Sequence, residues 1–137
     1  MVEQIDHIGV LVEDITSSRG IYEQLGIELV KTERVPEFGV EIAFMSNGTE
    51  LIELVEPLAD DEFTQLLVEQ DHSGFLHHIA FRVEDIEGVL EDLKRAGIGL
   101  RDPAPRQGAG GASVAFLEQA AGNGVNIELV ERDEEVI

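Results

Sequence analysis

The chain repeats part of its own sequence, and this repeat limits the possible folds more than any other feature. The stretch Ile5–Ile15 (IDHIGVLVEDI) returns 71 residues later within Phe75–Ile86 (FLHHIAFRVEDI), where His78 takes the place of His7. The similarity continues at the same spacing as far as Leu100. A repeat of this length indicates two copies of one structural unit that share a core.

A second repeated word lies near the end of each copy. Ile52–Glu56 (IELVE) recurs letter for letter as Ile127–Glu131, now 75 residues apart, so the second copy contains extra residues in a loop. Each copy therefore offers one histidine on its first strand and one glutamate on its last strand, at equivalent places. These residues are His7 and Glu53 in the first copy, and His78 and Glu128 in the second.

Alternating apolar residues and turn signals predict the same order of elements, βαβββ, in both copies. In the first copy we expect strands over 2–12, 27–34, 40–45 and 50–56, with a helix over 15–25. In the second we expect strands over 75–83, near 98, over 112–117 and over 125–130, with a helix over 86–96. Asp14 and Asp85 are expected to cap the two helices, and Asn47-Gly48 is expected to form a two-residue hairpin turn.

These elements predict an α+β fold made of two paired βαβββ modules that share one mixed, curved sheet. Each module alone would be marginally stable, so we expect a single domain over residues 1–137. Its repeats would span about 1–58 and 74–132, and apolar residues at helical spacing predict a short helical linker between them.

The charge of the chain excludes several classes of partner. There are 29 acidic and 9 basic residues, and the resulting formal charge of −20 repels nucleic acid and anionic membranes. No apolar run approaches the roughly 18 residues of a membrane span, and no signal peptide is recognisable, so we expect a cytoplasmic protein. The acidity is typical of a halophilic protein, whose self-repulsion concentrated salt screens; an acidic protein from a low-salt habitat is the alternative.

The duplicated histidines and glutamates form a candidate metal site. Glycine and alanine lie close after the two histidines, at Gly9 and Ala80, and leave room above the imidazoles. The absence of cysteine excludes thiolate ligands. Two neutral imidazoles and two carboxylates suit a six-coordinate divalent ion, such as Co, Mn, Ni or Zn, with two positions open for water or substrate. A lone histidine or glutamate is more often structural, but their recurrence in register favours metal binding by His7, Glu53, His78 and Glu128.

Other polar features are interpreted differently. His77 should lie on the opposite face of its strand from His78 and is not expected to bind the metal, while His72 lies in a polar turn and should be exposed. The glycine-rich segment Gly108–Gly111 lacks the Lys-Ser/Thr ending of a phosphate-binding loop and precedes a strand. Its glycines are expected to let a mobile loop pass close to a bound ligand. The charged tail after Glu131 is expected to fray.

Several segments together carry a resemblance to a known family. They are Ile5–Gly9, Val35–Val40, Glu53–Leu58, Leu76–Val83, Gly108–Gly111 with Val114–Leu117, and Gly124–Leu129. These segments resemble the methylmalonyl-CoA epimerases of the vicinal oxygen chelate superfamily over nearly the whole chain. The resemblance implies paired βαβββ modules around a metal site, with the metal ligands at the four residues that the repeat had singled out.

The resemblance also implies a reaction, the metal-dependent epimerisation of methylmalonyl-CoA at C2. The α-proton would be removed and returned on the other face through an enolate that the metal stabilises. Glu128 is the expected base by resemblance, and Glu53, its counterpart in the repeat, is the candidate for the second acid–base role. Some family members have a carboxylate at the position of Ile42, and Glu41 beside it should face the other way. The implied partners are an acyl-CoA substrate and, by fold analogy, a second copy in a homodimer.

Two alternatives stay open on the sequence. A glyoxalase-type lyase or isomerase acting on glutathione-like hemithioacetals would use the same four ligands and the same proton abstraction beside a carbonyl. A metal-free ligand-sequestering protein of this fold would not need the histidine and glutamate set that the chain retains. An extradiol dioxygenase would need more aromatic residues than the single Tyr and absent Trp provide.

Overall fold

The computed structural model describes residues 1–59 and 61–137; Asp60, in the predicted linker, lies outside the described residues. The chain forms two compact units. Unit 1 combines Met1–His7 with His78–Glu135, and unit 2 combines Ile8–His77 with Val136–Ile137. The boundaries fall within strands β1 (Val2–Leu11) and β5 (Phe75–Val83), so each unit contains one part of β1 and one part of β5.

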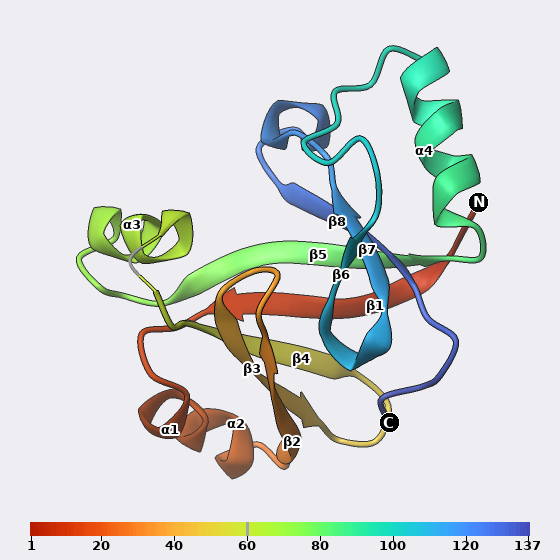
Figure 1. Ribbon diagram of the computed structural model, residues 1–137. Coiled ribbons are helices and arrows are strands. Elements are labelled where there is room, and N and C mark those ends of the chain that lie inside the picture. Colours follow the sequence, from red (N-terminus) through yellow and green to blue (C-terminus); the bar gives the residue numbers. More distant parts are fainter. Residues whose placement is uncertain (60) are drawn as a thin grey trace. The chain divides into compact units, whose positions relative to one another are not determined.

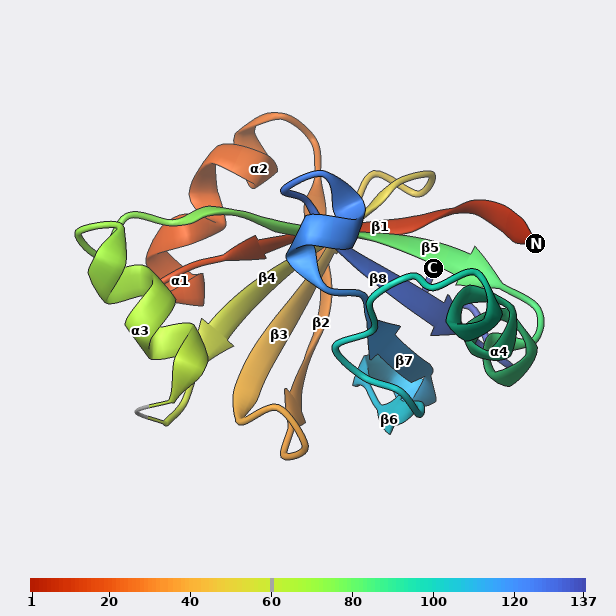
Figure 2. The ribbon, with the colours of Figure 1, turned by 90° about the horizontal axis from the view of Figure 1, so that it is seen from above.

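Unit 2 contains most of the first βαβββ series, as predicted (Figure 1). Its further elements are α1 (Ile15–Ser18), α2 (Gly20–Gln24), β2 (Glu28–Val35), β3 (Val40–Ser46), β4 (Leu51–Pro57) and the linker helix α3 (Glu62–Glu69). Strand β4 runs parallel to β1, and β3 pairs antiparallel with both β4 and β2 (Figure 2). The predicted helix over 15–25 is divided in two at Arg19. The buried cluster Val12, Ile15, Ala43, Met45 and Leu54 joins α1 to the sheet.

Unit 1 contains most of the second series. After β5 come α4 (Ile86–Arg95), β6 (Arg106–Gln107), β7 (Ser113–Phe116) and β8 (Asn126–Glu131), with short 3₁₀ turns η1 (Ala109–Gly111) and η2 (Gln119–Gly122). Strand β8 is parallel to β5 and antiparallel to β7, so the sheet is mixed, as predicted. Helix α4 packs on the face that carries Val83, Ala115 and Leu129. The strand expected near residue 98 is wrong: Leu100 forms only an isolated bridge to Leu117, and the short strand lies further on, at β6.

The predicted two-residue turn at Asn47-Gly48 is also wrong. Ser46 pairs with Leu51, so the turn comprises the four residues between them. The Asn47 side-chain oxygen accepts hydrogen bonds from the backbone N–H groups of Thr49 and Glu50, both at 3.0 Å. This side-chain bonding, which asparagine offers readily in turns, stabilises the longer loop.

The last glutamate of the repeated IELVE word caps a helix in each unit. Glu56 Oε1 accepts the N–H of Ile15 at 2.8 Å, and Glu131 Oε1 accepts the N–H of Ile86 at 2.9 Å. Each carboxylate thereby satisfies one of the N–H groups that a helix start leaves without an intrahelical partner. The predicted caps Asp14 and Asp85 are confirmed, since each accepts an N–H from the first turn of its helix.

Replacing Glu131 with alanine should therefore lower the free energy of unfolding by about 0.5–2 kcal/mol, the usual loss for a helix cap. Glu131→Gln retains a side-chain oxygen and should lose less. Urea unfolding monitored by circular dichroism measures both. Glu134→Ala is the matched control, because Glu134 is an exposed glutamate of the same segment. Equal stabilities for Glu131→Ala and Glu134→Ala would show that the cap contributes nothing.

Among the residues that the structure describes, no helix combines the length and apolarity needed to cross a membrane.

Candidate metal centre

Two neighbouring strands of unit 1 present His78 and Glu128 from the same face of the sheet. Strands β5 and β8 are parallel, and Ala80 is the register partner of Glu128. Because side chains alternate along a strand, Glu128 projects away from the face on which Leu129 packs against α4. Ala80, the register partner of Glu128, is small and fully buried.

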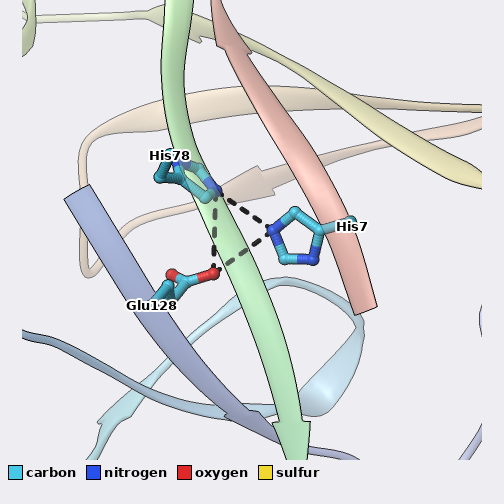
Figure 3. Close-up of side chains that lie close together, drawn as sticks. All are labelled: His7, His78 and Glu128. Atoms are coloured by element: carbon cyan, nitrogen blue, oxygen red, sulfur yellow. Dashed lines mark hydrogen bonds and ion pairs between the residues drawn. The ribbon is translucent and has the colours of Figure 1, made fainter. Parts of the chain in front are cut away.

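His7 of β1 joins this pair to form a compact, buried cluster (Figure 3). Its Nε2 atom lies 3.1 Å from Nε2 of His78 and 3.2 Å from Oε1 of Glu128, and the latter two atoms are 3.7 Å apart. The ring of Phe116 packs edge-on against His78, with 5.4 Å between ring centroids. Three of the four predicted metal-binding residues therefore direct one nitrogen or oxygen atom each toward a common point.

The hydrogen bonding of the cluster fits a divalent cation. Nδ1 of His7 lies 2.7 Å from Oδ1 of Asp6, and donation to this carboxylate leaves a lone pair on Nε2. With neutral imidazoles, the 3.2 Å contact between this Nε2 and Glu128 Oε1 then brings two lone pairs together without a proton. A cation among the three ligand atoms would relieve that repulsion, and imidazole nitrogen with carboxylate oxygen suits borderline ions such as Zn, Co, Ni or Mn.

Asp6 anchors His7 and is itself held by two arginines, a feature that the sequence analysis missed. Arg132 donates from Nη2 to Oδ1 at 2.9 Å and from Nε to Oδ2 at 3.0 Å, while Arg82 donates from Nε to Oδ2 at 3.0 Å. Burial by itself raises the pKa of the Asp6 carboxyl, but the hydrogen bonds from His7 and Arg132, together with the charge of Arg132, lower this pKa by a larger amount. The net pKa lies well below the usual aspartate range, so the carboxyl group is ionised.

The chain's C-terminal segment contributes to this network, so the prediction of a frayed tail after Glu131 is wrong. The side chain of Arg132 is only 3% exposed. Glu135 pairs with Arg82 through both carboxylate oxygens. Arg132 also donates from Nη1 to the carbonyl oxygen of Ala109 at 3.2 Å, which ties the glycine-rich loop to Asp6.

Glu53, the fourth predicted ligand, belongs to unit 2. It is buried on β4, with Gly9 as its register partner on β1 and Phe44 as its partner on β3. Glu128 has the corresponding partners Ala80 and Phe116 in unit 1. The two glutamates thus occupy equivalent places in the strand pairing of their units, as the repeat indicated.

Two other sequence interpretations concern the neighbouring strand β3. Ile42 is buried, whereas Glu41 lies 3.6 Å from Arg34 and is partly exposed, which agrees with the opposite facing expected for these residues.

The remaining histidines lie in unit 2 and have different surroundings. His77 is buried against the rings of Phe63 and Phe75, at centroid distances of 5.4 and 6.3 Å. His72 is exposed, as predicted, and lies 3.9 Å from Glu13. Neither therefore takes part in the cluster of His7, His78 and Glu128.

Comparison with known proteins identifies relatives along most of the chain. Residues 6–116 match the family described as the Glyoxalase/Bleomycin resistance protein/Dioxygenase superfamily. An uncharacterized protein of Bacillus subtilis, YqjC, is 39% identical over 95% of this chain and 93% of its own length. The ethylmalonyl-CoA/methylmalonyl-CoA epimerase of Cereibacter sphaeroides is 32% identical over 94% of this chain and 98% of its own.

Solved structures give the same relationship. A methylmalonyl-CoA epimerase of Streptomyces coelicolor, in complex with 2-nitronate-propionyl-CoA, superposes with a TM-score of 0.88 at 27% identity. The superposition covers 98% of this chain and 100% of that one. The predicted fold class is confirmed by this agreement and by the βαβββ series described above.

Proposed function

The chain belongs to the Glyoxalase/Bleomycin resistance protein/Dioxygenase superfamily, also called the vicinal oxygen chelate superfamily, and from this premise we propose that it epimerises methylmalonyl-CoA at C2. The observation that carries the proposal is the buried cluster of His7, His78 and Glu128. Relatives that match nearly the whole chain are named for this reaction, and one of them is in complex with an acyl-CoA compound. The substrate class we propose is therefore an acyl-CoA with an acidic α-proton.

We assign metal binding to His7, His78 and Glu128, with Glu53 as the fourth ligand on the grounds of the sequence repeat. A divalent ion held there would supply Lewis-acid stabilisation of the negative charge that develops on a carbonyl oxygen of the substrate. The side chains of His7, His78 and Glu128 are buried, and the low polarity of such surroundings strengthens the charge interactions among them.

Glu128 is our candidate for the base that removes the α-proton. Its Oε1 atom makes both contacts with the imidazoles, whereas its second oxygen points away from them (Figure 3). One carboxylate can therefore place one oxygen in the cluster and use the other to accept a proton, so that Glu128 can be both a metal ligand and a base. Glu53 is the candidate for the second acid–base role, because the repeat makes it the counterpart of Glu128.

The decisive experiment incubates metal-loaded protein with one epimer of methylmalonyl-CoA in deuterated water. We expect deuterium at C2 and equilibration of the two epimers, because a base that exchanges its proton with solvent returns the label. Mass spectrometry measures the label, and a coupled assay or chiral separation measures the epimers. Protein treated with a chelator is the control.

One result would contradict the proposal, and a second measurement would then distinguish the alternative. Unlabelled and unchanged thioester, in the presence of bound metal, would exclude the epimerase activity. Turnover of a glutathione hemithioacetal in the same preparation would then favour the glyoxalase-type alternative, which uses proton abstraction beside a carbonyl as well.

Assembly as a homodimer stays a prediction from fold analogy.

A further inference from the structure

We propose that Asp6 is a positioning residue that holds His7 with its proton on Nδ1 and its Nε2 lone pair directed toward His78 and Glu128, and that Arg132 holds Asp6 in place. The inference deepens the proposed function and rests on its metal site, but it does not depend on the identity of the substrate. Its basis is a set of contacts within unit 1, centred on Asp6, His7 and Arg132, whose side chains are 0%, 2% and 3% exposed.

The tautomer of His7 follows from the fact that the Asp6 side chain can only accept hydrogen bonds. Its side chain is 0% exposed, and His7 Nδ1 lies 2.7 Å from Oδ1. An ionised carboxylate only accepts hydrogen bonds, so Nδ1 of His7 must be the donor. The proton is then committed to Nδ1, and the opposite nitrogen is left as a ligand. Carboxylates and backbone carbonyls are the usual partners of the second nitrogen in metal-binding histidines.

The two arginines explain why a buried carboxylate can stay ionised at this place. Oδ1 accepts from His7 and Arg132, and Oδ2 accepts from Arg132 and Arg82. Glu135 balances the second arginine at the outer end of the network. Two positive and two negative charges therefore compensate one another, which removes most of the cost of an isolated buried charge.

Arg132 contributes more than charge. It is the residue that touches both Asp6 oxygens and also the Ala109 carbonyl, so a single rigid guanidinium joins the position of His7 to the loop Gly108–Gly111. The planar fork of arginine makes these contacts simultaneously, which a lysine ammonium at the same position could not do.

The first test needs no substitution and no metal. Long-range ¹H–¹⁵N correlation spectra of the uniformly labelled, metal-free protein distinguish a protonated from an unprotonated ring nitrogen. We expect His7 to show a protonated Nδ1 and an unprotonated Nε2. A His7 spectrum with an unprotonated Nδ1 would overturn the proposal, whatever the protein's activity on any thioester.

The second test compares Asp6→Asn with Asp102→Asn by competition between the protein and a coloured chelator for Co²⁺ or Zn²⁺. Asp102 is the matched control, a buried aspartate of unit 1 that accepts from the Phe116 backbone N–H at 2.9 Å and lies 3.5 Å from Arg106. Loss of an outer partner of a metal-binding histidine typically weakens binding by about 10–100-fold. We expect that loss for Asp6→Asn and an unchanged Kd for Asp102→Asn, even though both can lower stability.

Arg132→Lys and Arg132→Met extend the test if Asp6→Asn does not fold. Lysine keeps the positive charge, so Arg132→Lys should retain part of the metal affinity, whereas Arg132→Met should lose more of it. The ring-nitrogen signals of His7 should change in the same order. A folded Asp6→Asn or Arg132→Met with the parent's Kd would overturn the positioning role. Failure of the thioester assay alongside an intact tautomer and Kd pattern would instead reject only the proposed reaction.

Discussion

Replacing His78 with alanine is expected to eliminate the binding of one divalent ion per chain, while replacing His77 with alanine leaves it intact. Nε2 of His78 lies 3.1 Å from Nε2 of His7 and 3.7 Å from Oε1 of Glu128. Its neighbour His77 packs against Phe63 and Phe75 instead. Loss of a residue that only hydrogen-bonds to a metal-binding histidine weakens metal binding by roughly 10–100-fold, and removal of a metal ligand itself should weaken it by more.

The pair of variants is well matched because both residues are buried histidines of strand β5. Elemental analysis of protein purified in the presence of the metal gives the stoichiometry, and chelator competition gives the Kd. Circular dichroism verifies that each variant is folded. Equal loss of metal in both variants would show that the cluster of His7, His78 and Glu128 is not the binding site.

The repeat was sufficient to find the cluster because the same positions recur in both copies. His78 and Glu128 were singled out as the counterparts of His7 and Glu53, and three of these four side chains meet in unit 1. Strand alternation correctly separated His77 from His78, because neighbouring residues on a strand point to opposite faces. Local patterning likewise predicted the caps at Asp14 and Asp85.

The same reasoning could not find the network behind His7. At the spacing of the repeat, Asp6 corresponds to His77 and Arg132 corresponds to Pro57, so neither residue recurs. Asp6 and Arg132 are also 126 positions apart in the chain. A charged residue near the C-terminus looks the same in sequence whether it is solvated or paired in the core. Only the folded arrangement distinguishes these cases.

The alternation of side chains along a strand also fails to predict the contact between Asp6 and His7. Neighbouring residues point their Cβ atoms to opposite faces of a strand, which argues against contact between Asp6 and His7. Rotation about the side-chain bonds nevertheless brings Oδ1 of Asp6 within 2.7 Å of Nδ1 of His7. The direction of a Cβ atom therefore restricts the position of a functional group but does not determine it.

Replacing Glu128 with glutamine should abolish most of the exchange of deuterium into methylmalonyl-CoA while the protein still binds its metal. Glutamine has the size of glutamate and keeps one carbonyl oxygen that can serve as a ligand. Its amide cannot accept the α-proton, and general acid–base catalysis typically contributes about 10²–10⁴-fold to a rate. We therefore expect a fall in kcat of that order, with a metal content close to the parent's.

Glu131→Gln provides the control for this experiment, since Glu131 lies on the same strand but caps helix α4. It should keep the exchange rate of the parent even where its stability is lower. Metal content is measured on every sample, so that loss of the base can be separated from loss of the ion. A metal-loaded Glu128→Gln protein that exchanges the C2 proton at the parent's rate would reject Glu128 as the base. Glu53→Gln would then be the next variant to assay, because Glu53 has the equivalent strand partners in unit 2.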